Sequence, residues 1–140
     1  MSFREKIAWA SLLGHLIVFG VYFALCASGW VAPSVGAGQV LVQMGGAVIA
    51  LIVISIVLAI TAVVSAPKDV KPHYDEREKL IRLRAANVAS AIVIAGVILV
   101  MNALLFGWNA VLAANLLLAV LVISEIVKAI AQIVQFRTNI

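Results

Sequence analysis

The sequence predicts an all-α integral membrane protein with four transmembrane helices, arranged as two hairpins, and with both termini in the cytoplasm. Of its 140 residues, 65% are apolar and only 11% are charged, a composition well outside that of ordinary soluble domains. Two long blocks, residues 7–67 and 85–124, contain no Asp, Glu, Lys or Arg. One pass through the hydrocarbon core takes about 20 residues, so each block is long enough for two passes.

The charged segment between these blocks, Lys68–Arg84, predicts the topology. It holds six of the ten basic and four of the six acidic residues. The two outer connections, residues 28–38 and 107–109, have no basic residue. The other basic residues lie near the ends of the chain and are Arg4, Lys6, Lys128 and Arg137. Because Lys- and Arg-rich loops stay in the cytoplasm, both termini and the central loop are predicted to be cytoplasmic.

Turn and capping residues set the expected helix ends. The apolar run from Ile7 to Ala27 is too long for a signal-peptide core, so we expect a retained helix. Pro67 ends the second helix, and Asp75 with Glu78 forms a capping box for the third. We therefore expect one membrane domain over residues 1–140, with helices at 5–27, 39–65, 75–106 and 110–135 and a cytoplasmic loop at 66–84.

Three sets of residues within the spans predict helix contacts. Residues with polar atoms share one face of the first helix, namely Ser11, His15, Tyr22 and Cys26. A stripe of small and amide residues on the second helix suggests close packing and a homo-oligomer, through Gln39, Gln43, Gly46 and Ala50. Asn102 and Asn115 lie about five residues from the turn that joins the last two helices, which suggests a hydrogen bond between them.

Glu125 is the acidic residue set deepest in an apolar span, and it is a candidate for proton or ion coupling. It lies about 22 Å along the fourth helix, and ionisable groups at such depth are costly and often functional. Lys128, three residues on, can pair with it, which is the architectural alternative. His15 has a comparable depth on the first helix, so the two side chains could meet if these helices pack together.

The sequence contains no pattern that indicates an enzyme. No Cys/His cluster has metal-ligand spacing, and no phosphate-binding glycine loop is present. Cys26 is the only cysteine, which excludes an internal disulfide. The basic character is explained by topology, so we expect no cofactor, no metal and no nucleic-acid partner.

The segment Asp75-Glu-Arg-Glu-Lys-Leu-Ile, between two apolar hairpins, resembles a known pattern. It is similar to the central loop, Asp-Glu-Arg-(Asp/Glu)-x-x-Ile, of small predicted four-helix membrane proteins of bacteria and archaea, of unknown function. The resemblance implies a multi-pass protein of the bacterial or archaeal cytoplasmic (inner) membrane. Some members of that family are encoded beside small helix-turn-helix regulators, which suits a cytoplasmic protein partner. The resemblance implies no role for any residue.

Two functions follow as hypotheses. In the leading one, the protein is not an enzyme, and its charged cytoplasmic loop engages a protein partner or lipid headgroups. The candidate partner-binding residues are Asp75, Glu76, Arg77, Glu78 and Arg82. In the alternative, the protein is a small proton-coupled transporter or efflux protomer that uses Glu125, with His15 and Lys128 beside it.

Overall fold

The computed structural model describes residues 3–29, 36–65 and 76–138. Four helices account for nearly all of them, as the sequence predicts, and each is long and apolar enough to cross a membrane. They are α1 (Phe3–Ala27), α2 (Ala37–Ser65), α3 (Glu76–Leu105) and α4 (Ala110–Arg137). Every helix end lies within two residues of its predicted position. Asp75, the predicted cap of α3, lies outside the described residues.

Two of the helix ends that differ from prediction, the start of α2 and the end of α4, have a local cause. The amides of Gln39 and Val40 donate to the carbonyl of Gly36, so α2 starts two residues early. Thr138 donates its amide to Val134, which closes the last turn of α4 beyond the predicted end.

A tight turn joins α3 to α4, as predicted. Gly107 adopts φ of 81°, a left-handed conformation that glycine tolerates best at a helix C-terminus. Its amide donates to Leu104 and that of Trp108 donates to Ala103. The Asn109 side chain then caps α4 by accepting a hydrogen bond from the Val111 amide at 2.7 Å. These bonds occupy backbone groups that a helix end would otherwise leave unpaired.

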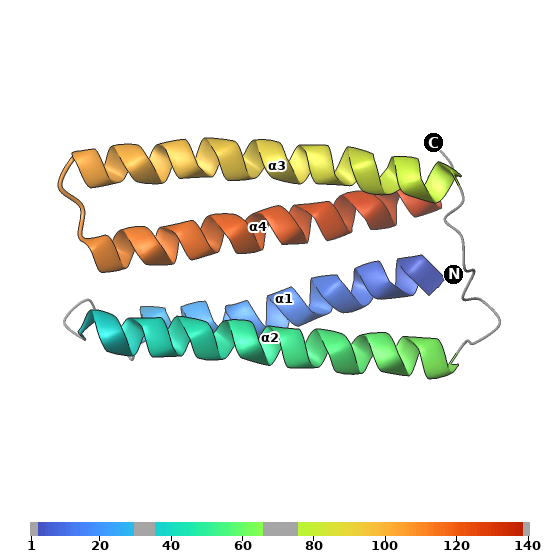
Figure 1. Ribbon diagram of the computed structural model, residues 1–140, viewed down its shortest axis with the longest axis horizontal. Coiled ribbons are helices and arrows are strands. Elements are labelled where there is room, and N and C mark those ends of the chain that lie inside the picture. The colour runs from blue at the N-terminus through green and yellow to red at the C-terminus, as the bar shows by residue number, and fades with distance from the viewer. Residues whose placement is uncertain (1–2, 30–35, 66–75, 139–140) are drawn as a thin grey trace.

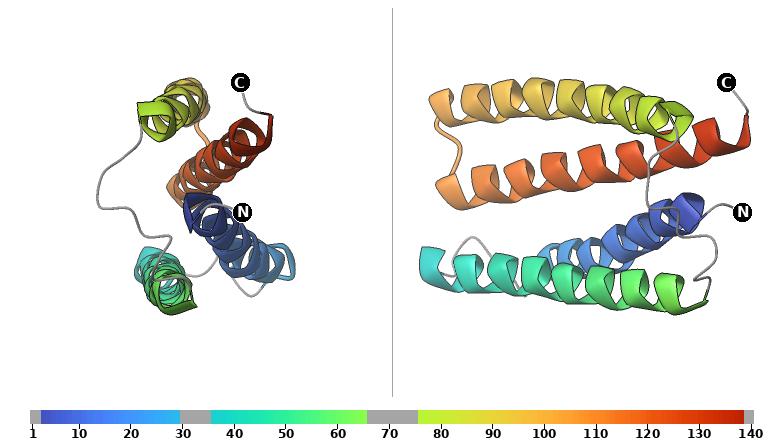
Figure 2. Two further views of the ribbon diagram at one scale, coloured as in Figure 1. Left: turned by 90° about the vertical axis from the view of Figure 1, so that its right-hand side faces the viewer. Right: turned by 45° about the vertical axis from the view of Figure 1, so that its right-hand side comes forward.

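The four helices lie side by side in the order α3, α4, α1, α2 (Figure 1). Among the described residues, the extensive contacts are those of α3 with α4, α4 with α1, and α1 with α2. The row is curved, so that the end-on view of Figure 2 shows a C-shaped section with α2 and α3 as its two rims. The start of α1 and the end of α4 lie at the same end of the bundle.

Two apolar clusters hold α1 against α4. One combines Ala8 and Leu12 with Ala129 and Ile133. The other lies two turns further along and consists of Phe19, Tyr22, Leu118 and Val122. Large apolar side chains are exposed on all four helices, as expected where the surroundings are hydrocarbon.

Candidate functional site

Glu125 and Lys128 form an ion pair along α4, which confirms the predicted pairing. The Lys128 ammonium lies 2.9 Å from Glu125 Oε1 and 2.8 Å from Oε2. The pair is not enclosed by the protein, because 41% of the Glu125 side chain and 32% of the Lys128 side chain are exposed. A carboxylate and an ammonium thus neutralise each other about 22 Å along the helix from Ala110.

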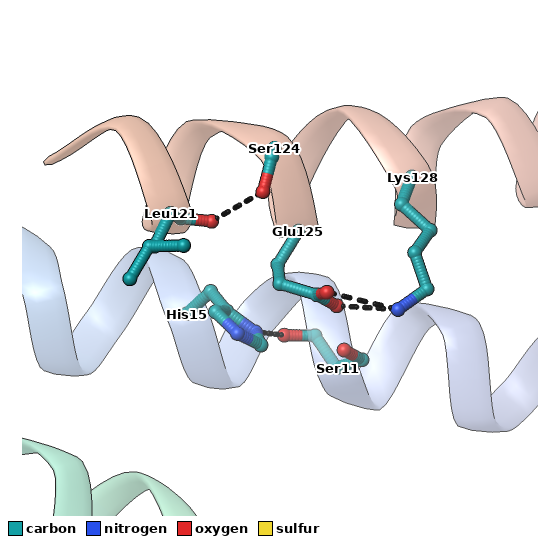
Figure 3. Close-up of polar contacts among 6 residues, drawn as sticks. All are labelled: Ser11, His15, Leu121, Ser124, Glu125 and Lys128. Carbon is teal, nitrogen blue, oxygen red and sulfur yellow. Dashed lines mark hydrogen bonds and ion pairs between the residues drawn. The ribbon is translucent and has the colours of Figure 1, made fainter. Parts of the chain in front are cut away.

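His15 faces this pair from α1. In Figure 3 its imidazole lies against α1, and the Glu125 carboxylate extends from α4 toward the same part of α1. His15 Nδ1 lies 2.7 Å from the Ser11 carbonyl oxygen. A carbonyl can only accept, so Nδ1 carries the proton of this bond, and Nε2 of the neutral ring keeps a lone pair. The sequence places the two residues at similar depth, and the packing of α1 on α4 brings them to facing sides.

The cluster formed by Ser11, His15, Glu125 and Lys128, here called the polar cluster, lies on the concave side of the bundle. Successive helical residues are about 100° apart. On α4 this places Glu125 and Lys128 between the face that packs on α3 and the face that packs on α1. On α1, His15 lies between the face toward α4 and the face toward α2, where Gly14 packs against Leu51. In Figure 2, α2 and α3 lie on the same side of the α4–α1 pair, and this is the side that the helical positions give for the polar cluster.

Ser124, the residue before Glu125, belongs to a different face. It is buried, and its hydroxyl donates to the Leu121 carbonyl at 2.7 Å within α4. It provides a comparison residue at the same depth that is not part of the polar cluster.

A second polar contact joins α1 to α4 nearer the α3–α4 turn. The Tyr22 hydroxyl donates to Asn115 Oδ1 at 2.7 Å, and Cys26 Sγ approaches the same oxygen at 3.9 Å. The Asn115 amide donates to the Val111 carbonyl. The predicted Asn102–Asn115 bond is wrong, because Asn102 donates to Ile98 within α3. Equal depth was insufficient to identify the partner, since it does not say which face of each helix meets the other.

A third contact joins the same two helices at their other end, and sequence reasoning missed it. Arg137 Nε donates to Glu5 Oε1 at 3.0 Å, and the guanidinium lies 5.6 Å from the centroid of the Trp9 ring. Glu5 is buried, with only 7% exposure. The available signal was that Glu5, near the start of the first helix, and Arg137, near the end of the last helix, have opposite charges. Such pairs of opposite charges are too common to identify a contact.

The predicted stripe on α2 faces α1 over part of its length. Gln43, Gly46 and Ala50 line a cavity of about 430 Å³, together with the α1 residues Ile17, Val18, Val21, Tyr22 and Leu25. The Gln43 Oε1 atom is buried and has no hydrogen-bond partner in the described structure. The small residues therefore leave space between α2 and α1.

The candidate partner-binding residues are only partly described. Asp75 lies outside the described residues, while Glu76, Arg77, Glu78 and Arg82 fall in the first two turns of α3. Glu76, Arg77 and Arg82 are exposed and Glu78 is half-buried. Glu76 and Glu78 lie in the first turn, where acidic side chains stabilise the positive end of the helix.

The described residues contain no group of three His, Cys, Asp or Glu side chains that could hold a metal ion. No known protein family matches the chain, and neither does any curated protein or solved structure. Helix length and hydropathy therefore define the class, which is that of a multi-pass membrane protein with four spans.

Proposed function

We propose that this protein couples the movement of protons or cations across a cytoplasmic membrane, without enzymatic activity, and that Glu125 is the coupling group. The observation that supports the proposal is the convergence of Glu125, Lys128 and His15 on one accessible concave face. Ionisable groups within a span are costly unless they face protein or water, and they commonly mark ion pathways.

The geometry suits competition at a single carboxylate. Lys128 reaches Glu125 through a long, flexible side chain, and both oxygens contact the one ammonium. An incoming cation must displace the Lys128 ammonium to bind the Glu125 carboxylate. A proton that binds Glu125 removes the negative charge of the carboxylate, and the Lys128 ammonium is then no longer held by it. Proton, cation and Lys128 are then mutually exclusive at Glu125, which is the requirement for exchange. In this proposal, Nε2 of His15, on the facing helix, accepts or returns the proton, since Nδ1 is engaged by the Ser11 carbonyl.

The test is cation-driven proton movement in vesicles. Purified protein is reconstituted with a pH-sensitive dye inside, a proton gradient is imposed, and Na⁺, K⁺ and organic ammonium ions are added in turn. We expect Glu125→Gln to lower the rate at least roughly tenfold, a loss of about 1.4 kcal/mol of stabilisation. Ser124→Ala, at the same depth but outside the polar cluster, should keep the wild-type rate. Rates equal to those of protein-free vesicles for every cation would contradict the proposal.

The substitution Lys128→Gln tests whether the ion pair takes part in ion coupling or only supports the fold. If Lys128 competes with the cation, its removal lowers the half-saturating cation concentration, by roughly tenfold for a competing contact of about 1.4 kcal/mol. If the ion pair only supports the fold, the same substitution lowers stability and leaves cation affinity unchanged.

The charged start of α3 supports a second function, that of engaging a cytoplasmic protein partner. The supporting observation is the exposure of Glu76, Arg77 and Arg82 on consecutive turns at one end of the bundle. A photo-crosslinking residue at position 76, used in intact membranes, would capture such a partner. Reversing the charges of Arg77 and Arg82 should abolish the crosslink, and Glu125→Gln should preserve it.

A further inference from the structure

No described residue of a single copy covers the concave face of the bundle. Its rims are α2 and α3, which belong to different hairpins and lie at the two ends of the row of helices. Val40 is the only buried residue among the α2 side chains that the structure describes. Large apolar side chains on α3 are also exposed, among them Ile94 at 62% and Met101 at 59%.

The concave face carries the charged side chains of Glu125 and Lys128, which must be shielded from lipid. Glu125 and Lys128 lie within a span, yet 41% of the Glu125 side chain and 32% of the Lys128 side chain remain exposed. Charged side chains within membranes face a bundle interior or a water-filled cavity, because contact with hydrocarbon costs several kcal/mol. The cover must therefore bring polar groups or water to the level of Glu125.

We propose that a second copy of this chain covers the concave face, so that the two polar clusters share one central cavity. The face is self-complementary because it presents one acid and one base side by side. Copies inserted in the same orientation are related by a twofold axis along the membrane normal, which places their polar clusters at one depth. Glu125 then faces the partner subunit's Lys128, and the apolar rim α2 packs on the partner's α3.

This arrangement differs from association through the α2 stripe, since Gln43, Gly46 and Ala50 line a cavity that they share with α1 of the same copy. It also stands independently of ion coupling, because the argument rests on the open face and its charges alone.

Adjacent residues on α3 provide a matched pair for the test. The buried residues of α3, among them Ala89 and Gly96, mark its face toward α4. At about 100° per residue, Ser90 lies beyond the concave edge of that face, and Ala91 lies on the convex side. Both are exposed. Ser90→Trp should obstruct the partner, whereas Ala91→Trp should project into lipid.

The experiment is energy transfer between donor- and acceptor-labelled copies of the full chain, mixed in phosphatidylethanolamine–phosphatidylglycerol vesicles at high dilution. Wild type should show transfer well above that of non-interacting copies at the same density. Ser90→Trp should weaken association by roughly tenfold, the effect of an overpacked contact worth about 1.4 kcal/mol. Ala91→Trp should match wild type. Transfer at the chance level for wild type, or equal transfer for the two tryptophan variants, would overturn the proposal.

A charge-neutral variant tests the polar cluster separately. The combination of Glu125→Gln and Lys128→Gln leaves no unpaired charge and should weaken association by roughly tenfold. Circular dichroism would show that its helix content is retained. Unchanged association would overturn the assignment of this ion pair to the interface. If the variant loses helix content, the comparison of Ser90→Trp with Ala91→Trp decides the proposal alone.

Discussion

The two faces of α4 hold their neighbours in different ways. Toward α3, small residues allow close approach, and Gly96 lies directly against Val120. Toward α1, two apolar clusters are accompanied by two polar contacts, Tyr22–Asn115 and Glu5–Arg137. Helices in lipid gain little from hydrophobicity, so contact depends on van der Waals packing and interhelical hydrogen bonds. Helix α4 therefore contacts α3 by van der Waals packing, and it contacts α1 by both packing and polar contacts between the helices.

The largest effect is expected from Gly96→Ala, which breaks the α3 side. A Cβ at this position would lie 2.6 Å from Val120 Cγ2 and 3.0 Å from Val120 Cβ. Valine is stiff and cannot swing away, so the helices must separate. We expect the free energy of unfolding to fall by about 1–3 kcal/mol, measured by circular dichroism in mixed micelles with increasing dodecyl sulfate.

Two controls sharpen this result. Gly20→Ala has no neighbour within 4 Å of its Cβ, so it should raise stability by up to about 1 kcal/mol through helix propensity. Val120→Ala in the Gly96→Ala background should recover part of the loss. Equal effects of the two glycine substitutions would show that close approach is unimportant.

A smaller effect is expected on the α1 side, from the Tyr22–Asn115 hydrogen bond. A double-mutant cycle with Tyr22→Phe and Asn115→Ala isolates it, with stability again measured in mixed micelles. The coupling energy should be about 0.6 kcal/mol and at most about 1.7 kcal/mol, the range of such bonds between spans. Strict additivity of the two substitutions would mean that this hydrogen bond contributes nothing to the contact of α1 with α4.

The smallest effect is expected from Glu5→Gln, which weakens the other polar contact. The Arg137 side chain is 61% exposed, so solvent screens the pair and the loss should stay under about 1 kcal/mol. The difference from wild type should shrink as salt is raised. Arg137→Lys keeps the charge but loses the planar group over Trp9, so it reports the stacking contribution separately. A loss that is insensitive to salt would contradict an electrostatic origin.

Local patterns in the sequence predicted much of this molecule. Apolar blocks and turn residues such as Pro67 and Gly107 located four helices, because these signals act within a few residues. The pairing of Glu125 with Lys128 was equally local, since residues three apart on a helix are neighbours. The shared face of Ser11, His15, Tyr22 and Cys26 was also predictable, and two of these residues, Tyr22 and Cys26, do contact Asn115 of α4.

Which residues contact each other across two helices was harder to predict from the sequence. Asn102 was expected opposite Asn115, yet Tyr22 from the other hairpin occupies that position. The Glu5–Arg137 contact joins residues 132 apart in the chain, so no short-range pattern could indicate it. Periodicity identifies a polar face but not the helix that it meets.

By itself, the sequence determined that the chain forms four apolar helices of spanning length and that Glu125 has its counterion three residues away. Only the tertiary structure decided that α4 lies between α3 and α1, that His15 therefore faces Glu125, and that α2 and α3 are left as rims of an open face. The reason is physical. Helix formation and i,i+3 pairing are set by neighbours along the chain. The order of helices depends on which side-chain surfaces fit, such as Gly96 against Val120, and that fit exists only once the helices are assembled.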